Sequence, residues 1–377
     1  MKILFAGDAS NMHNCLATQL KRMGHTAVVV SDGSRWMDTG RDINLTRRPG
    51  RWGAVQYAAR LLRQLPLWRG YDVVELASPI FFKLRPERLQ WVLDWLRRHN
   101  RMVVLSALGT DYVYYTACHD GHTFRYSDYR IGNEPSPYVL SSEYIAQHQD
   151  NWKLPVMRRY SDHVTGCIDG AVACLYEYWA AYRPVLPPDR LAYAGIPIDT
   201  SSLTPSGSAA TAPQSVRFFI GIQRDRNVIK GTDRLLAALK RVHDRYPREC
   251  QMEVVESLPY AEYVSRMRTS HVILDQLYSY TPATNALIAM AQGLVAVSGA
   301  EPEYYQLIGE RDNHPIVNVD PIREGDIDAR LEWLVRNRAM LPQLSRQSRE
   351  FVLKHNAAAV VAQRYLDFWQ RLLDAKQ

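Results

Sequence analysis

Residues 271–298 constrain the fold more than any other stretch of the chain. A short apolar run at 272–277 predicts a buried strand, and a polar turn at 279–281 follows it. Residues 282–292 are then apolar at nearly every position, which is typical of a helix enclosed by protein on all sides. Because 294–297 begin another apolar strand, this order predicts an α/β fold in which helices cover a parallel sheet.

The start of the helix expected at 282–292 is the first candidate binding site. Thr281 can cap the helix with its hydroxyl, Pro282 suits the first helical position, and Gly293 suits the left-handed residue that ends it. The first helical turn carries free N–H groups and the positive end of the helix dipole, so it attracts anions and commonly phosphate. The residues that we expect around such a phosphate lie in and just before this turn: Ser279, Thr281, Ala283, Thr284 and Asn285.

The sequence Ala-Met-Ala-Gln-Gly at 289–293 resembles the second half of the "E-A-M-A-x-G" donor-binding motif of GT-B glycosyltransferases. The resemblance is to the retaining group related to sucrose synthases and to lipopolysaccharide or mannosyl transferases. It implies two Rossmann-like domains that face a cleft and a nucleotide-diphosphate sugar as the donor. The two glutamates of the family motif fall on Tyr280 and Ile288 here, and we expect Tyr280 to contact the donor sugar in place of a glutamate.

A basic loop at 223–233 carries the second match to this family. Lys230 and Gly231 stand where the family places a lysine on the donor diphosphate, and Arg224 or Arg226 would supply the arginine. A basic loop and a helix start would then hold the same anion. The alternative is an exposed loop that binds no ligand.

Three further site residues are implied by the resemblance. Glu256 ends a strand where the family contacts the nucleotide base. Gly7 lies in the glycine loop after the first strand, which faces the acceptor cleft in the family. Asp111 ends the segment 107–111, which resembles the family's "H-G-S-D" with leucine at the histidine position, and we expect it to be catalytic. The alternative is that Asp111 only caps the segment that follows it.

Length and composition predict two domains. A chain of 377 residues, 46% of them hydrophobic, can bury two cores. Residues 201–215 are mostly small and carry no charge, which is typical of a linker. We therefore place an N-terminal acceptor domain at 1–200 and a C-terminal nucleotide-sugar domain at 216–355. The apolar helix at 356–377 is expected to cross back onto the first domain, as in the family.

Basic residues are concentrated between positions 47 and 101, where twelve Lys and Arg face four Asp and Glu. Trp52, Trp68, Trp91 and Trp95 lie among them. Tryptophan interleaved with arginine suits an anionic membrane surface, and a solvated face of a basic enzyme is the alternative. No nucleic-acid motif accompanies the charge, so nucleic acid is not an expected partner. Without a signal peptide or a membrane span, we expect a cytoplasmic protein that can attach to the inner face of the membrane.

The cysteines and histidines show no pattern typical of a metal site. The five cysteines form no C-x-x-C pair and are odd in number, which argues against a zinc site and against a disulfide framework. His119 and His122 lack the helical H-E-x-x-H spacing. They lie in a long stretch without clear periodicity, at 112–152, which we expect to recognise the acceptor.

The resemblance to GT-B glycosyltransferases implies an enzyme that is metal-independent, needs no cofactor and moves a sugar from a nucleotide-diphosphate sugar to a glycan, lipid-linked or small-molecule acceptor. Retention of anomeric configuration is implied by the resemblance alone. Two alternatives remain open. The missing glutamate pair and loop histidine are consistent with a catalytically inactive GT-B binding protein, and a sugar-nucleotide epimerase shares the fold.

Overall fold

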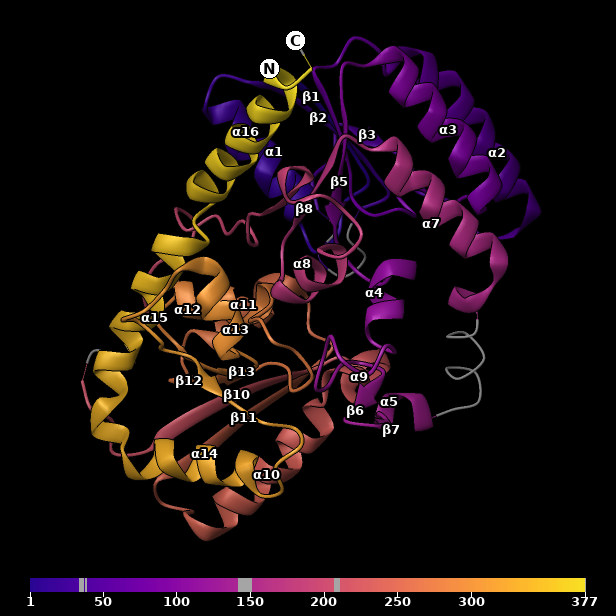
Figure 1. The fold of residues 1–377 in the computed structure, drawn as a ribbon. Coiled ribbons are helices and arrows are strands. Elements are labelled where there is room, and N and C mark those ends of the chain that lie inside the picture. The colour runs from indigo at the N-terminus through magenta and orange to yellow at the C-terminus, as the bar shows by residue number, and fades with distance from the viewer. Residues whose placement is uncertain (34–36, 38, 142–150, 207–210, 377) are drawn as a thin grey trace.

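The computed structural model describes residues 1–33, 37, 39–141, 151–206 and 211–376. Two β-sheets with their helices occupy the upper and lower halves of Figure 1. The first sheet has seven strands in the order β3-β2-β1-β4-β5-β8-β9, and the second has five in the order β11-β10-β12-β13-β14. The strand pairs within both sheets are parallel. The expected α/β fold with two Rossmann-like sheets is therefore confirmed.

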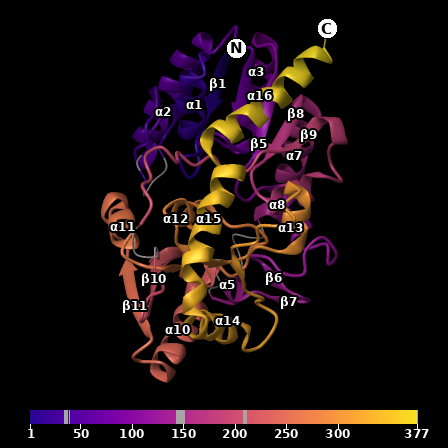
Figure 2. The same ribbon diagram turned by 90° about the vertical axis from the view of Figure 1, so that its left-hand side faces the viewer.

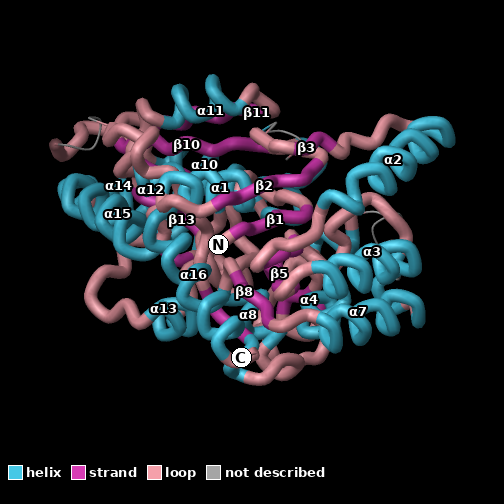
Figure 3. Tube along the Cα trace, turned by 90° about the horizontal axis from the view of Figure 1, so that it is seen from above, coloured by secondary structure: helices cyan, strands magenta, loops and turns pink. Residues whose placement is uncertain are grey.

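The first sheet and its helices come from the first half of the chain. Its strands are β1 (Lys2–Ala6), β2 (Thr26–Ser31), β3 (Ile43–Asn44), β4 (Val73–Leu76), β5 (Val103–Ala107), β8 (Gly170–Ala173) and β9 (Leu191–Tyr193). Its helices are α1 (Met12–Arg22), α2 (Gly50–Gln64), α3 (Pro86–His99), α7 (Pro155–Cys167) and α8 (Tyr176–Tyr182). Figure 3 shows α2, α3 and α7 together on one side of this sheet.

Both faces of the first sheet are buried, as a parallel sheet requires. Leu4 and Ala6 of β1 enter a core with residues of α2, α3 and α7. Ile3 and Phe5, whose side chains point to the opposite face, enter another core with α1 and the C-terminal helix. The continuous apolar strands of the sequence follow from this double burial.

The second sheet is built from the second half of the chain. Its strands are β10 (Val216–Ile222), β11 (Cys250–Glu256), β12 (Val272–Leu274), β13 (Val295–Ser298) and β14 (Val317–Asn318). The helices of this half are α9 (Asn227–Lys230), α10 (Thr232–Arg245), α11 (Tyr260–Met267), α12 (Thr284–Ala291), α13 (Pro302–Ile308), α14 (Asp326–Arg336) and α15 (Leu341–His355).

Short 3-10 helices occur in both halves. They are η2 (Leu65–Leu67) and η3 (Pro188–Arg190) in the first half, and η5 (Arg224–Arg226) and η6 (Arg338–Met340) in the second.

The last helix, α16 (Ala358–Asp374), returns to the first half of the molecule. It follows α15 along the molecule and ends beside the N-terminus (Figures 1 and 2). Its residues Tyr365 and Trp369 are fully buried in the core that contains Ile3 and Phe5. The expected crossing of the C-terminal helix is therefore confirmed.

The stretch at 112–152 is more regular than the sequence predicts. It contains α4 (Tyr112–Ala117), the two-stranded antiparallel sheet of β6 (Arg130–Ile131) and β7 (Glu134–Pro135), and α5 (Pro137–Leu140). These elements extend to the second half, where α5 contacts α9 (Figure 1). Residues 142–150 of this stretch, and 207–210 of the expected linker, lie outside the described residues.

Candidate functional site

A cavity of about 970 Å³ lies between the two halves of the molecule, and loops from both sheets line it. These loops follow the ends of β1, β5 and β8 in the first sheet and of β10 and β12 in the second. Ligands of open α/β sheets collect at the carboxyl ends of the strands, so this cavity is the candidate site. The predicted site residues that line it are Arg224, Arg226, Lys230, Ser279, Ala283, Thr284 and Asn285.

Lys230 is held against the wall of the cavity by a buried carboxylate. Its Nζ lies 3.6 Å from Oδ1 of Asp275, and Nδ2 of Asn285 donates to the same oxygen at 3.0 Å. Asp275 is 1% exposed, and its other oxygen has no hydrogen-bond partner in the described residues. Gly231 ends α9 with a φ of 68°, and a Cβ there would come within 2.7 Å of Leu277. The Lys-Gly pair therefore fits a tight bend that only glycine allows.

The helix after the polar turn begins later than the sequence predicts. Ala283 is the N-cap of α12, so Pro282 lies outside the helix. Alanine offers no acceptor to the first turn, and that turn contains no acidic residue. Ala283, Thr284 and Asn285 line the cavity. The start of α12 thus meets the cavity without a capping side chain, as an anion site requires.

Thr281 does not cap α12, and this prediction is wrong. Its Oγ1 donates to Oε2 of Glu177 at 2.8 Å and accepts the N–H of Tyr176 at 3.0 Å. The N–H groups of Tyr280 and Thr281 donate to Oε1 of Glu177 at 2.6 and 3.2 Å. Glu177 belongs to α8 in the first half of the molecule. The carboxylate of Glu177, from the opposite half, therefore accepts the Thr281 hydroxyl that the sequence predicts to cap α12.

Tyr280 is buried between the two halves and does not line the cavity. Its ring stacks on Tyr126 and Tyr176, with centroids 4.8 and 5.6 Å apart, and its hydroxyl accepts the N–H of Arg125 at 2.7 Å. The side chain is only 2% exposed. This aromatic cluster already encloses the ring, so the geometry gives no support to the expected contact between Tyr280 and a donor sugar.

Asp111 is also placed differently from the prediction. It is the N-cap of α4, where Oδ1 accepts the N–H of Tyr114 at 2.8 Å and Oδ2 accepts the hydroxyl of Tyr182 at 2.7 Å. Burial raises the pKa of Asp111 to about 6, and these hydrogen bonds oppose the rise. Asp111 is 2% exposed and is not among the residues that line the cavity. The geometry matches the capping alternative and gives no support to a catalytic role.

Gly7 and Glu256 lie at the edges of the site. Gly7 has a φ of 88°, and a Cβ there would approach Ala77 and Phe81 to 2.9 Å, so the loop needs glycine. It lines a smaller cavity of about 190 Å³ that shares residues with the first. Glu256 ends β11 and forms an exposed ion pair with Arg224. This pair stands at the rim of the site.

The wall formed by the first half carries four carboxylates that sequence reasoning missed: Asp8, Asp32, Asp128 and Glu177. Asp32 pairs with Lys83 of the same wall. Burial raises the pKa of Asp128 to about 7, and the positive charge of Arg226 opposes this rise. Burial also raises the pKa values of Asp8 and Glu177. Asp8 and Glu177 follow strand ends, which is the signal that could have found them. Asp128 has no such signal, because it reaches the cavity from the stretch at 112–152.

A buried polar chain supports the loop that carries Gly7. Nδ1 of His13 lies 2.8 Å from the carbonyl of Gly7, and Nε2 lies 2.9 Å from Oγ of Ser106. Ser106 Oγ is 2.6 Å from Oε1 of Glu75, whose Oε2 accepts the indole N–H of Trp369 at 3.0 Å. Burial lowers the pKa of His13 to about 4 and raises that of Glu75 to about 8. The chain therefore links the loop of the first strand to α16 through neutral groups near pH 7.

The basic stretch at 47–101 forms a surface with exposed apolar side chains. Trp52 on α2 is 81% exposed and Trp91 on α3 is 52% exposed, whereas Trp68 is buried in the core. Trp68 is therefore not a surface residue, contrary to the grouping made from the sequence. Within the described residues, no helix is both long and apolar enough to cross a membrane.

No family model and no curated protein matches this sequence. Solved structures do match it along the whole chain. Sucrose-phosphate synthase from Thermosynechococcus elongatus has a TM-score of 0.63 at 11% identity, with 100% of both chains covered. HepE from Anabaena, in complex with UDP-glucose, has a TM-score of 0.58 at 12% identity, covering 97% of this chain and 98% of that one. MnaA from S. aureus, solved with UDP, has a TM-score of 0.55 at 10% identity, covering 99% and 97%.

At these identities the likeness shows the fold alone. The fold is GT-B, with two Rossmann-like domains that face a cleft and a C-terminal helix that crosses back to the first domain. The cavity described above lies in that cleft.

Proposed function

We propose that the protein is a glycosyltransferase that uses a nucleotide-diphosphate sugar as its donor. The observation that carries the proposal is that the two walls of the cavity differ in their balance of charge. The second domain presents Arg226, Lys230 and the uncapped start of α12, with Asp225 as an acid among them. The first domain presents Asp8, Asp128 and Glu177, together with an ion pair of Asp32 and Lys83. A donor with an anionic diphosphate and hydroxyl-rich sugars fits such a pair of walls.

The basic wall is the proposed site of the diphosphate. Lys230 supplies a positive charge, and the first-turn N–H groups at Thr284 and Asn285 supply donors with the favourable end of the dipole. Ser279 lines the cavity, and its hydroxyl is buried without a hydrogen-bond partner in the described residues. A buried hydroxyl without a partner is unfavourable, and a phosphate oxygen would supply the missing partner.

The same groups give the proposed reaction its main electrostatic aid. As the bond between the sugar and the diphosphate breaks, negative charge accumulates on the departing diphosphate. Preorganised N–H groups and a lysine that point at this charge stabilise the transition state, and such electrostatic stabilisation can be the largest single contribution to catalysis. The carboxylates of the first domain can accept hydroxyl groups of the sugar or of the acceptor, and a carboxyl group that titrates near pH 7 is suited to move a proton. We include metal independence and retention of configuration in the proposal, the latter on the likeness of residues 289–293 to the retaining family.

The structural neighbours support this choice of donor. HepE was solved with UDP-glucose and MnaA with UDP, so this fold accommodates such ligands in other proteins. UDP and UDP-glucose are therefore the first probes, followed by a panel of other nucleotide sugars. A ligand at 100 times its dissociation constant stabilises the folded state by about 2.7 kcal/mol, which raises the melting temperature by a few degrees.

Product analysis separates the proposal from its two alternatives. A transferase consumes the donor faster when an acceptor is present and attaches the sugar to it. An epimerase would convert the donor sugar in the absence of an acceptor, and an inactive binding protein would be stabilised by the nucleotide without any turnover. Absence of stabilisation by every nucleotide sugar in the panel would overturn the proposal.

We propose that the acceptor enters through the smaller cavity. It opens beside Gly7 and Asp8, and Tyr57, Phe81 and Phe82 form its apolar part. Tyr57 lies on α2, the same helix that exposes Trp52. An acceptor with an apolar portion, such as a lipid-linked glycan, would therefore meet the site next to the exposed face of α2.

We further propose that this face of α2 and α3 attaches to an anionic membrane. Its exposed apolar side chains are Trp52, Val55 and Leu62 on α2 and Trp91 on α3, and Leu67 of η2 is exposed next to α2 in the chain. Exposed arginines on α2 lie among them, and each contributes about 1 kcal/mol near an anionic surface. Binding to liposomes should rise with the anionic lipid fraction and fall with salt, and Trp52→Ala should weaken it. Equal sedimentation with neutral and anionic vesicles would exclude this attachment.

A further inference from the structure

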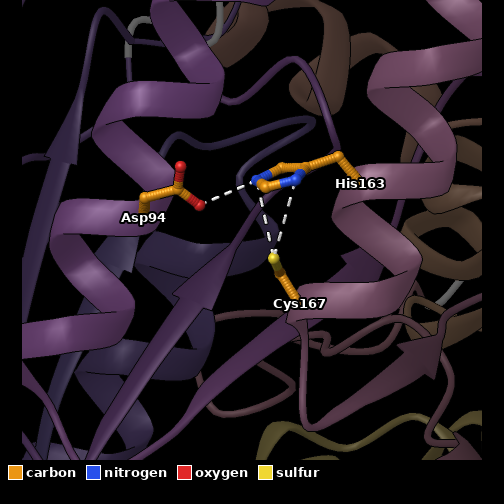
Figure 4. Close-up of side chains that lie close together, drawn as sticks. All are labelled: Asp94, His163 and Cys167. Atoms are coloured by element: carbon orange, nitrogen blue, oxygen red, sulfur yellow. Dashed lines mark hydrogen bonds and ion pairs between the residues drawn. The ribbon is translucent and has the colours of Figure 1, made fainter.

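A second group of reactive side chains lies between α3 and α7, outside both cavities. Nε2 of His163 lies 2.7 Å from Oδ1 of Asp94 and 3.5 Å from Sγ of Cys167. Figure 4 shows the three side chains pointing toward one another, with Asp94 on one helix and the other two on its neighbour. One carboxylate oxygen, one imidazole nitrogen and one sulfur all lie within 4.8 Å of one another.

The two helices bring these groups together in a simple way. His163 and Cys167 are four residues apart on α7, so they lie on the same face of the helix one turn apart. The helix α3 packs against α7 and places Asp94 beside the imidazole. The side chains of Asp94 and His163 are 41% and 25% exposed, so an ion can reach the group from solvent.

We propose that Asp94, His163 and Cys167 bind a divalent transition-metal ion of the zinc type. Zn²⁺ takes these three ligand classes at about 2.0–2.3 Å, and a tetrahedral geometry then sets nitrogen and sulfur about 3.6 Å apart. The observed 3.5 Å between Nε2 and Sγ fits that geometry. Nε2 and Oδ1 would separate from 2.7 Å to about 3.3 Å, a small shift for a partly exposed Asp94 side chain.

The ligand set also determines which ion the site prefers. A thiolate and an imidazole favour zinc and other soft or borderline ions over Mg²⁺ and Ca²⁺, which take oxygen ligands. Three protein ligands leave a fourth position for water. Binding needs the thiolate, so a protonated Cys167 releases its proton to the buffer as the metal–sulfur bond forms, with no change of oxidation state. The ion would clamp α3 to α7 on the outer layer of the first domain.

The test uses Co²⁺ as a coloured substitute for Zn²⁺ and the full-length protein, reduced and freed of metal. We expect one Co²⁺ per chain, a thiolate-to-cobalt charge-transfer band in the near ultraviolet, and loss of the band when Zn²⁺ is added. Cys167→Ser should abolish the band. His163→Gln should weaken Co²⁺ binding at least tenfold, and Asp94→Asn should weaken it less, because the aspartate is the most exposed ligand.

A control variant tests whether any close His and Asp would suffice. His122 lies 3.5 Å from Asp120 on an exposed loop and has no sulfur in its group, so His122→Gln should bind Co²⁺ like the wild type. Circular dichroism must show that each variant is folded. If Cys167→Ser does not fold, the weaker Co²⁺ binding of His163→Gln tests the proposal instead. A folded, reduced wild-type protein without the charge-transfer band would overturn the proposal. Persistence of the band in Cys167→Ser would also overturn it.

Discussion

The two walls of the cleft differ in how their chemistry is encoded. On the second domain, Lys230 and the start of α12 belong to continuous motifs, in which glycine and alanine positions set the backbone and leave N–H groups facing the cavity. On the first domain, Asp128 and Glu177 come from separate elements and meet only through the fold. The second wall can therefore be recognised locally, whereas the first requires the tertiary structure.

The two walls are also joined by hydrogen bonds and ion pairs between the domains. Glu177 accepts three hydrogen bonds from Tyr280 and Thr281, the turn that leads into α12. Arg125 pairs with Glu301 at 2.5 Å and Glu303 at 2.8 Å, again across the two domains. The first domain therefore holds the loop from which α12 begins. Tyr280 stands where the motif that this stretch resembles has a glutamate, and an acid of the opposite domain, Glu177, accepts its N–H.

The largest effect is expected when the contact between the walls is broken. Glu177→Ala leaves the N–H groups of Tyr280 and Thr281 buried without an acceptor, which should lower the free energy of unfolding by about 3 kcal/mol. Thermal and denaturant unfolding measure this loss. Glu177→Gln keeps an acceptor for both N–H groups and should lose much less. Equal stability of the alanine variant and the wild type would show that the two walls are not coupled through this residue.

A second prediction concerns the polar chain beneath the first wall. Burial raises the pKa of Glu75 to about 8 from an ordinary value near 4.5, so the folded state holds a proton that the unfolded state releases. Stability should therefore fall as the pH rises from about 4.5 to 8, by about 2 kcal/mol after allowance for relaxation of the site.

Glu75→Gln tests this sign directly. Its amide can donate to Ser106 as the protonated acid does and can still accept the indole N–H of Trp369. The variant should unfold with the same free energy near pH 5 and be more stable than the wild type at pH 8. If the stability of this variant depends on pH as that of the wild type does, groups other than Glu75 cause the dependence.

A third prediction tests whether Asp128 faces the donor. Because its pKa is about 7, Asp128 gains negative charge as the pH rises from 6 to 8, and this charge should repel an anionic diphosphate in the same cavity. The affinity for UDP-glucose, whose diphosphate does not titrate in this range, should fall on the order of tenfold. Asp128→Asn should remove the fall. An unchanged pH profile in this variant would exclude Asp128 from the site of the donor.

The smallest effect is expected at Tyr280. Tyr280→Phe removes the hydroxyl that accepts the N–H of Arg125 and keeps the ring that stacks on Tyr126 and Tyr176. Stability should fall by about 1 kcal/mol, and transfer kinetics at a temperature well below melting should not change. A large loss of transfer rate at unchanged melting temperature would show instead that the Tyr280 hydroxyl contacts the donor sugar.

The sequence predicts most of the fold and about one wall of the site. Apolar runs and glycine positions define strands such as β12 and β13, because these properties depend on neighbouring residues. The start of α12 and the role of Thr281 could not be predicted, since a distant carboxylate, Glu177, competes for the same hydroxyl. Asp111 was ambiguous in the sequence because capping and catalysis use the same residue type. Only its burial and its bond to Tyr182 decide between them.

The central claim is that the second-domain wall binds the donor diphosphate. Lys230→Gln removes the charge and keeps a donor for Asp275, while Lys240→Gln removes an exposed lysine of α10 as a matched control. Calorimetry with UDP should show affinity reduced about tenfold to a hundredfold in the first variant and unchanged in the second, because a hydrogen bond to a charged group contributes about 1.5–3 kcal/mol. Wild-type affinity in Lys230→Gln, at wild-type melting temperature, would contradict the account.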